Sequence, residues 1–280
     1  MSITNILTVD VEDYFHVSAL AKNISVDQWE NQSCRVERNT HKLLDLFDEK
    51  GVKATHFVLG WVAKRYPELI KEISNRGHEV ACHGYSHQLV YNQSIDVFRD
   101  ETTRSKQLLE DIIGDSVKGY RAASYSITRK SYWALDVLVE AGFEYDSSIF
   151  PVRHDNYGIP GFPREPHVVK TDKGNTIIEF PLTTYNYLSL AIPVAGGGYF
   201  RLYPYWLSRF FYKNINKKGN SFIFYLHPWE IDPEQPRVKT SMLSRFRHYN
   251  NLDKCENRLS QLLSEFSFTT MGDVVHKIGN

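Results

Sequence analysis

The sequence has no excess of either charge, few cysteines and no long apolar run. Its 280 residues contain 33 Lys and Arg and 33 Asp and Glu, so no overall field attracts nucleic acid or an acidic membrane surface. The cysteines, Cys34, Cys82 and Cys255, are too few and too widely spaced for a disulfide framework or a CxxC metal knot. No stretch approaches the roughly 18 apolar residues of a membrane span. We therefore expect no nucleic-acid partner, no membrane span and a reducing compartment.

Several common sequence signatures are also absent. The chain has no G-x-S-x-G elbow, no G-x-x-x-x-G-K-[ST] phosphate loop and no G-x-G-x-x-G after an expected strand. These absences argue against the usual serine hydrolases, nucleoside triphosphatases and dinucleotide-binding enzymes. The first residues show no basic segment followed by an apolar run, so we expect a cytoplasmic protein.

Short apolar runs alternate with amphipathic stretches along the chain. Strands are expected near residues 6–9, 54–59, 78–82, 120–122, 143–146, 176–180 and 222–226, and helices over 36–50, 62–76, 95–113, 130–140 and 203–217. This alternation favours parallel strands with crossover helices, as a barrel or an open doubly wound sheet. The proline-rich stretch 151–175 interrupts the alternation and predicts a long surface loop. No linker divides residues 1–280, so a single α/β domain is expected.

Two histidines and an acidic cluster form a pattern typical of a catalytic metal site. His83 and His87 follow the strand that is expected to end at Cys82. On a helical turn, this spacing would bring both imidazoles to the same side. Asp10-Val11-Glu12-Asp13 follows the first strand and offers a carboxylate as third ligand, which leaves positions open for water and substrate. The alternative interpretation is structural. The two histidines would then be polar residues at the start of a helix, and the acidic cluster would form a solvated turn.

The carboxylate ligand depends on where the first strand ends. If the strand persists through residue 12, its period of two places Asp10 and Glu12 on one face, and Glu12 is then the ligand. If the strand ends sooner, Asp13 is the second candidate. Two imidazoles and one carboxylate suit Zn²⁺ best, with Co²⁺ or Ni²⁺ as substitutes.

The same pattern offers residues for acid–base chemistry. Arg121 ends an expected strand and can pair with Asp10, which keeps that carboxylate ionised and oriented as a base. His227 follows the strand at 222–226 and can protonate a leaving amine. Together with a metal that polarises a carbonyl, these residues suit the hydrolysis of an amide. The alternative interpretations are again structural. Arg121 and Asp10 would form an ordinary ion pair, and His227 would be a histidine of the core.

Four segments resemble the motifs of the polysaccharide deacetylase family, also called carbohydrate esterase family 4 or the NodB-homology domain. They are Thr8-Val9-Asp10-Val11-Glu12-Asp13, Gly77-His78-Glu79 with His83-Gly84-Tyr85-Ser86-His87, Gly119-Tyr120-Arg121-Ala122-Ala123-Ser124-Tyr125, and Leu226-His227. The resemblance implies that Asp10 is the catalytic base and His227 the catalytic acid. Most members have adjacent aspartates where this chain has Asp10 and Val11. Members with an Asp-x-Asp pattern exist, which supports Glu12 as the ligand.

A narrower resemblance is to the exosortase-associated subgroup of these deacetylases. It rests on the segments 9–17, 196–201 and 227–232, and it implies a distorted (β/α)7-type barrel that acts in exopolysaccharide or surface-glycan biosynthesis. The portion from about 195–280 is then specific to the subgroup. Glycines allow close approach of a backbone to a ligand, and aromatic and arginine side chains can stack on or bind a sugar. The substrate-binding candidates are therefore Tyr125, Gly197, Gly198, Tyr199, Arg201 and Trp229.

The sequence thus predicts a metal-dependent N-deacetylase of a carbohydrate that bears N-acetyl groups. Two other functions remain open. One is an amidohydrolase of a small non-sugar C–N substrate, because the fold alone does not separate these activities. The other is a carbohydrate-binding pseudoenzyme that has lost its metal.

Overall fold

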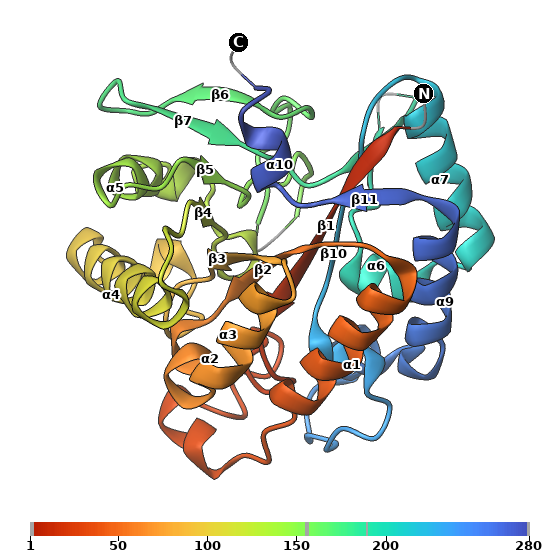
Figure 1. The fold of residues 1–280 in the computed structure, drawn as a ribbon, viewed down its shortest axis with the longest axis horizontal. Helices are drawn as coiled ribbons and strands as arrows, with labels where there is room; N and C mark the ends of the chain where they lie inside the picture. Colours follow the sequence, from red (N-terminus) through yellow and green to blue (C-terminus); the bar gives the residue numbers. More distant parts are fainter. Residues whose placement is uncertain (1–2, 155–156, 189, 279–280) are drawn as a thin grey trace.

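The computed structural model describes residues 3–154, 157–188 and 190–278, which form an α/β fold around one large sheet (Figure 1). Eight strands pair in the order β10-β1-β2-β3-β4-β5-β7-β6, and β11 pairs with β1. All of these pairings are parallel except that of β6 with β7. The strands are β1 (Thr4–Val11), β2 (Thr55–Val58), β3 (Glu79–Cys82), β4 (Gly119–Tyr120), β5 (Tyr145–Asp146), β6 (His167–Lys170), β7 (Thr176–Glu179), β10 (Ile223–Leu226) and β11 (Ser267–Thr269).

The expected single domain with a parallel sheet is confirmed, but strand pairing does not close it into a barrel. Within the described ranges, no ladder joins β10 to β6 or β7 at the other end of the sheet. The free side of β10 instead meets the segment around a small hairpin, β8 (Thr184–Tyr187) and β9 (Leu190–Pro193). Tyr225 N donates to Ala195 O at 2.8 Å, and Ile223 N donates to Thr183 Oγ1 at 2.7 Å. The Thr183 side chain and the Ala195 carbonyl therefore bond to the edge of β10 at which a closed barrel would have another strand.

Helices pack against the sheet and against one another, as α3 does with α4 and α1 with α9 (Figure 1). The α-helices are α1 (Val36–Lys50), α2 (Gly60–Arg65), α3 (Pro67–Asn75), α4 (Ile95–Ile113), α5 (Ala134–Glu140), α6 (Gly197–Leu202), α7 (Tyr205–Lys217), α8 (Met242–Tyr249), α9 (Leu252–Glu265) and α10 (Gly272–Val275). The short 3₁₀ helices are η1 (Val26–Asn31), η2 (Val90–Asn92), η3 (Ala123–Tyr125), η4 (Arg129–Ser131) and η5 (Pro228–Ile231). Among the described residues, no helix is both long and apolar enough to cross a bilayer.

The helix bounds follow from local sequence chemistry. α1 and α4 have the predicted bounds, and each ends at a glycine, Gly51 or Gly114, in the left-handed conformation. The single helix predicted over residues 62–76 is wrong, because Pro67 starts a second helix there. Proline restricts the residue before it and cannot continue the helical hydrogen-bond ladder, so Tyr66 separates α2 from α3. The expected loop at 151–175 contains β6, a four-residue edge strand that the surrounding prolines concealed.

Candidate active site

The side chains singled out in the sequence lie at the carboxyl ends of parallel strands. Asp10 lies near the end of β1, and His83 directly follows β3. Arg121 follows β4, and His227 follows β10. These strands occupy one half of the sheet, in the order β10-β1-β2-β3-β4, so their carboxyl ends meet at one edge. Residues up to 217 positions apart in the chain therefore share one site.

Glu12, His83 and His87 come together at this edge. Each offers one ligand atom, and these atoms all lie within 4.8 Å of one another. Glu12 Oε2 is 3.0 Å from His87 Nε2. In the described part of the chain this carboxylate oxygen is buried and accepts no hydrogen bond. A buried oxygen between two imidazoles is the kind of group that a cation would satisfy.

The protonation states of these residues also fit a divalent cation. His83 Nδ1 lies 2.7 Å from the carbonyl oxygen of Arg121, so Nδ1 carries the proton and Nε2 keeps its lone pair. Burial lowers the pKa of His83 to about 4, so its ring is neutral at pH 7. Burial would raise the pKa of Glu12, but the histidines at 87, 227 and 83 together hold it well below its usual value. The neutral imidazole of His83 and the ionised carboxylate of Glu12 are donors of the zinc type.

The two histidines lie on an irregular loop rather than on the helical turn that their spacing predicted. After β3 the backbone turns at Gly84, whose φ is +74°, and His87 has a φ of +50°. The Gly84 carbonyl accepts a hydrogen bond of 2.8 Å from Gly60 N at the start of α2. The ring centroids of His83 and His87 are 5.3 Å apart. A loop anchored on the neighbouring helix thus produces the convergence.

Glu12 reaches this group although β1 ends one residue earlier. Because the strand stops at Val11, the period-two argument for Glu12 does not apply. The Glu12 N–H donates to the Asp10 carbonyl at 2.9 Å, an i+2 to i bond that bends the chain as in a γ-turn. This bend, which the sequence did not predict, places Glu12 beside Asp10 at the strand end.

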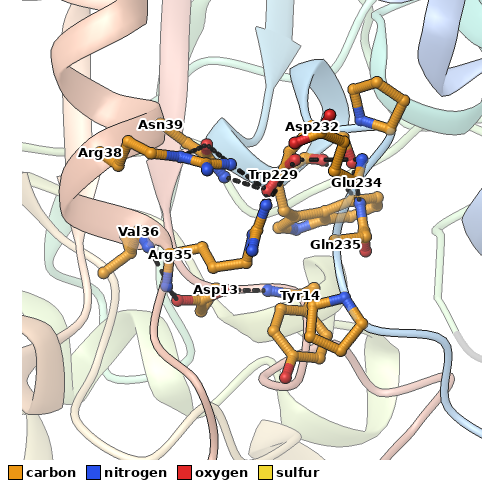
Figure 2. Close-up of polar contacts among 12 residues, drawn as sticks. Asp13, Tyr14, Arg35, Val36, Arg38, Asn39, Trp229, Asp232, Glu234 and Gln235 are labelled. Carbon is orange, nitrogen blue, oxygen red and sulfur yellow. Dashed lines mark hydrogen bonds and ion pairs between the residues drawn. The ribbon is translucent and has the colours of Figure 1, made fainter.

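Asp13, the second candidate for the acidic ligand, contacts the start of α1 instead. Its Oδ2 accepts from the backbone N–H groups of Arg35 and Val36, at 2.5 and 2.8 Å, and its Oδ1 accepts from Tyr14 N at 2.8 Å (Figure 2). Burial raises the pKa of Asp13 to about 6 although these three N–H groups oppose that change. The carboxylate therefore caps a helix N-terminus.

A second carboxylate on the same face of α1 ties that helix to η5. Asp232 accepts from the side chains of Arg35, Arg38 and Asn39, with Nε of Arg35 at 2.5 Å (Figure 2). Arg35 thus contacts both acidic groups, one through its backbone and one through its side chain. The link fixes the segment that carries Trp229 against the segment that carries Glu12.

Asp10 is held by a fully buried arginine. Arg121 Nη1 donates to Asp10 Oδ1 at 2.6 Å and to Thr8 Oγ1 at 2.8 Å. Its Nε and Nη2 donate to the carbonyl and hydroxyl of Ser147, at 3.1 and 3.0 Å. Tyr125 OH lies 3.5 Å from Asp10 Oδ2, the other carboxylate oxygen. One oxygen of Asp10 is therefore fixed by a charge-assisted bond, and the other remains available on the cavity side.

His227 follows β10, which pairs with β1 on the side away from β2 and β3. Its Nδ1 is 2.7 Å from Glu230 Oε1, and its Nε2 is 3.4 Å from Glu12 Oε1 and 3.8 Å from Asp10 Oδ2. Burial disfavours the charged ring, but the surrounding carboxylates outweigh this effect and raise the pKa of His227 to about 9. The Glu230 contact orients the ring so that Nε2 faces the other carboxylates.

Trp229 is enclosed by two histidine rings. Its ring stacks on His227, with centroids 5.0 Å apart, and on His248, with centroids 4.3 Å apart. Its indole Nε1 donates to Glu12 Oε1 at 3.4 Å. Both faces are thus covered by protein, so the geometry favours a positioning role over the predicted stacking on a sugar.

The glycine-rich segment at the start of α6 is shaped by β10. Gly196 has a φ of +131°, and a Cβ there would lie 2.0 Å from the carbonyl oxygen of Tyr225. A Cβ on Gly197 would lie 2.6 Å from the Tyr225 ring. The close approach therefore involves a strand rather than a ligand for these two glycines. Gly198, by contrast, is exposed and lines the cavity.

Arg201, a predicted sugar ligand, is buried and most of its donors are engaged by the protein. Its Nε donates to Glu230 Oε2 at 2.5 Å, and its Nη atoms donate to the carbonyls of Arg247, His248 and Asn250 at 2.8–3.1 Å. Arg201 therefore holds the carboxylate that holds His227. These bonds engage four of the five N–H groups of Arg201, which also lines the cavity.

A cavity of about 210 Å³ opens above these groups. The residues predicted from the sequence that line it are Asp10, Glu12, His83, His87, Tyr125, Gly198, Arg201, His227 and Trp229. Arg121 lies beneath Asp10, fully buried. Tyr199 lines the adjoining hollow, where its hydroxyl is 3.2 Å from that of Tyr157.

Sequence reasoning missed the residues that support the site from behind. Glu230, Ser147, Thr8 and His248 contact His227, Arg121 or Trp229. Glu230 carried a usable signal, because a glutamate three residues after His227 at a strand end suits a capping contact. The hydroxyl and imidazole contacts depend on the three-dimensional path of the chain and left no local pattern.

Two comparisons with family models divide the chain near its middle. Residues 25–145 match the polysaccharide deacetylase model, and residues 147–276 match a domain of unknown function, DUF3473. The second match agrees with the narrower resemblance to exosortase-associated deacetylases. Asp10, Glu12 and His227 lie outside the first matched range, so their association with it rests on the geometry above.

Curated relatives that match parts of the chain are deacetylases. A peptidoglycan-N-acetylglucosamine deacetylase of Bacillus cereus is 34% identical over 82 residues, which are 29% of this chain and 30% of that protein. A peptidoglycan deacetylase of Helicobacter pylori is 32% identical over 108 residues, 39% of this chain and 36% of that protein. The matches thus span about a third of these relatives.

Solved structures with a similar fold cover nearly the whole chain. A protein of Mycobacterium smegmatis assigned as a polysaccharide deacetylase aligns with a TM-score of 0.63 and 18% identity, over 99% of this chain and 94% of that one. A carbohydrate esterase family 4 pseudoenzyme of Bacillus anthracis aligns with a TM-score of 0.51 and 12% identity, over 98% and 66%. At such identities the likeness concerns the fold. The family-model matches of this chain are therefore to polysaccharide deacetylases over residues 25–145 and to DUF3473 over residues 147–276.

Proposed function

We propose that the chain is a metal-dependent hydrolase that removes N-acetyl groups from N-acetylhexosamine units of a bacterial exopolysaccharide or surface glycan. The observation that carries this proposal is the grouping of Glu12, His83 and His87 beside Asp10 and His227, at the floor of one cavity. A metal site with an adjacent base and acid has the parts that amide hydrolysis needs. The deacetylase names of the curated relatives support the same reaction.

Glu12, His83 and His87 are the residues that would hold the ion. Zn²⁺ suits two imidazoles and a carboxylate best, and Co²⁺ or Ni²⁺ could replace it. A bound divalent cation would act as a Lewis acid on the acetamide carbonyl. The backbone carbonyl of Arg121 orients the His83 ring, and the indole N–H of Trp229 orients the Glu12 carboxylate. Protein contacts therefore hold these two ligands in place without the ion.

Asp10 is the proposed base. The bond from Arg121 fixes one carboxylate oxygen, while Oδ2 is directed toward His227 and the cavity. From there Asp10 can accept a proton from the water molecule that attacks the carbonyl carbon. Because Arg121 is itself held by Thr8 and Ser147, the carboxylate has little freedom to turn away.

His227 is the proposed acid. Its Nδ1 is engaged by Glu230, so the proton that it delivers to the departing amine nitrogen would come from Nε2. Trp229 covers one face of the ring and keeps Nε2 near the carboxylates of Asp10 and Glu12. The products would be acetate and a sugar with a free amino group.

An acetate-release assay tests the proposal. Purified protein would be supplied with a divalent cation and a panel of N-acetylated oligosaccharides, beside His83→Ala. We expect acetate from at least one sugar and its loss in His83→Ala. His41→Ala is the matched control, because His41 lies on the surface against Glu72 and should leave the rate unchanged.

The two alternatives predict other results in the same assay. Turnover of cyclic ureides or imides without acetate release would indicate an amidohydrolase of small C–N substrates. Oligosaccharide binding without acetate release and without retained metal, even after supplementation with each of the three ions, would indicate a pseudoenzyme. Either result would overturn the proposal.

A further inference from the structure

Helix α8 borders the hollow that leads to the proposed site. A second cavity of about 470 Å³ adjoins the catalytic cavity of about 210 Å³, and Ser18, Ser124 and Arg247 line both. Leu243 and Phe246 of α8 line the second cavity. Both side chains are more than half exposed, so they lie where this cavity meets the solvent.

The outer face of α8 exposes large apolar side chains. Met242, Leu243 and Phe246 are 90%, 58% and 54% exposed. At about 100° per residue, they fall within an arc of about 100° around the helix axis. His248 lies on the opposite side of the helix, where it is buried against Trp229. Large apolar side chains that gather on one exposed face mark a contact with a partner or a membrane.

Cations flank this apolar face. Arg245 and Arg247 follow on its two sides at the same helical spacing, and both are exposed. Arg237 and Lys239, also exposed, precede the helix. Residues 235–252 contain these four cations and no Asp or Glu. In the described part of the chain, none of the four side chains forms an ion pair with a carboxylate. A chain that is neutral as a whole therefore has a local cationic surface here.

An anionic bilayer surface offers both kinds of contact that this face needs. Helices that lie in the membrane interface bury apolar side chains at the boundary of headgroups and acyl chains, and their basic side chains stay among the headgroups. Anionic lipids attract Lys and Arg that lie near the surface. A neutral apolar partner would cover the three large side chains but leave the four cations without anions.

We propose that α8 and the segment before it dock the protein reversibly on an anionic membrane surface. Met242, Leu243 and Phe246 enter the boundary of headgroups and acyl chains, and the four cations face the lipid phosphates. Because α8 borders the second cavity, docking brings the mouth of that cavity close to the membrane. This inference goes beyond the proposed function and does not depend on it, since docking requires neither metal nor sugar.

Flotation of the full chain with lipid vesicles tests the inference. Vesicles of phosphatidylethanolamine and phosphatidylglycerol are compared with vesicles of phosphatidylcholine alone. We expect the partition coefficient to be at least about tenfold higher for the anionic vesicles, because the cations contribute only there. Added salt should lower it, because mobile ions screen exposed charges.

Three variants separate the contributions. Phe246→Ser should lower partitioning onto the anionic vesicles at least about tenfold, because a large apolar side chain is lost. Arg245→Gln should lower it about fivefold, because one cation is lost. Phe210→Ser is the matched control, since Phe210 is 50% exposed on α7 and lines neither cavity. It should partition like the wild type.

Each outcome has a defined meaning. Wild-type partitioning of Phe246→Ser, or equal losses in Phe246→Ser and Phe210→Ser, would overturn the assignment to α8. Equal partitioning onto neutral and anionic vesicles would overturn the role of the cations. A dimer that dissociates in Phe246→Ser, without vesicle binding, would overturn docking in favour of a second copy of the chain. Equal thermal unfolding midpoints would show that the variants are folded, and Arg245→Gln keeps the test decisive if Phe246→Ser is not.

Discussion

At the scale of single residues, Asp10 is the group on which the proposed chemistry depends most. Its Oδ1 is bound to Arg121, and its Oδ2 faces the cavity. Replacement by asparagine keeps the shape and removes the base. We expect Asp10→Asn to lower the rate of acetate release by about 10²–10⁴-fold. The metal content should not fall, which elemental analysis of the purified variant would check.

The neighbours Glu12 and Asp13 offer a contrast between a ligand and a helix cap. Glu12→Gln should reduce the retained metal, because an ionised ligand is replaced by a neutral amide. Asp13→Ala should retain the metal but lower the free energy of unfolding by about 1–3 kcal/mol, since buried N–H groups lose their acceptor. Metal content and urea denaturation of both variants would reveal the difference. Loss of metal in Asp13→Ala alone would reverse the assignment.

At the scale of elements, the corner between β10 and η5 carries the acid and its support. Glu230, which is itself buried, accepts from His227 and from Arg201. Glu230→Gln would leave the Arg201 guanidinium without its anion. We expect a loss of about 3–5 kcal/mol in the free energy of unfolding. Glu234→Gln, an exposed glutamate four residues on, should change it little; similar losses in both would contradict the role given to this corner.

The elements also show what local sequence can predict. Gly51 and Gly114 mark helix ends, and the runs before Asp10, His83, Arg121 and His227 read correctly as strands. The bend at Glu12 and the loop at Gly84 depend on tertiary contacts, because Gly60 and Asp10 supply the partners. The sequence therefore identified the residues that come together in the site. It did not identify the bend and the loop of the backbone that bring them there. Their catalytic roles remain predictions.

At the scale of the whole molecule, buried histidines make folding stability depend on pH. His56 and His78 have ring centroids 4.9 Å apart, away from the strand ends that carry the site. Burial lowers the pKa of His78 to about 4 and holds that of His56 well below its usual value. The unfolded chain takes up protons at these rings near pH 6.5, whereas the folded chain does not. The contribution of these two rings to stability is therefore full above pH 6.5 and falls between pH 6.5 and 4.

Urea denaturation at several pH values checks this expectation. Each fully titrating ring contributes about 1.4 kcal/mol per pH unit to the decline. His78→Asn removes one titrating ring, and its amide oxygen can still accept from Ala54 N, as His78 Nδ1 does. The variant should therefore lose less stability on acidification than the wild type. An equal slope for the two proteins would refute the assignment.

The global arrangement explains both the success and the limit of the sequence interpretation. The alternation of strands and helices predicted a single parallel α/β domain, and the structure has that form. It did not predict what contacts the free edge of β10, because Thr183 and Ala195 bond to that strand outside any regular ladder. The second cavity likewise depends on side chains from α6 and α8 whose packing no local pattern specifies.

The central claim is that one divalent cation binds among Glu12, His83 and His87. The most direct measurement is anomalous diffraction from crystals of the protein grown with Zn²⁺, collected at the zinc absorption edge. The account predicts one strong peak within about 2.0–2.2 Å of the carboxylate and the two imidazoles. A peak elsewhere, or none at these three side chains, would contradict it.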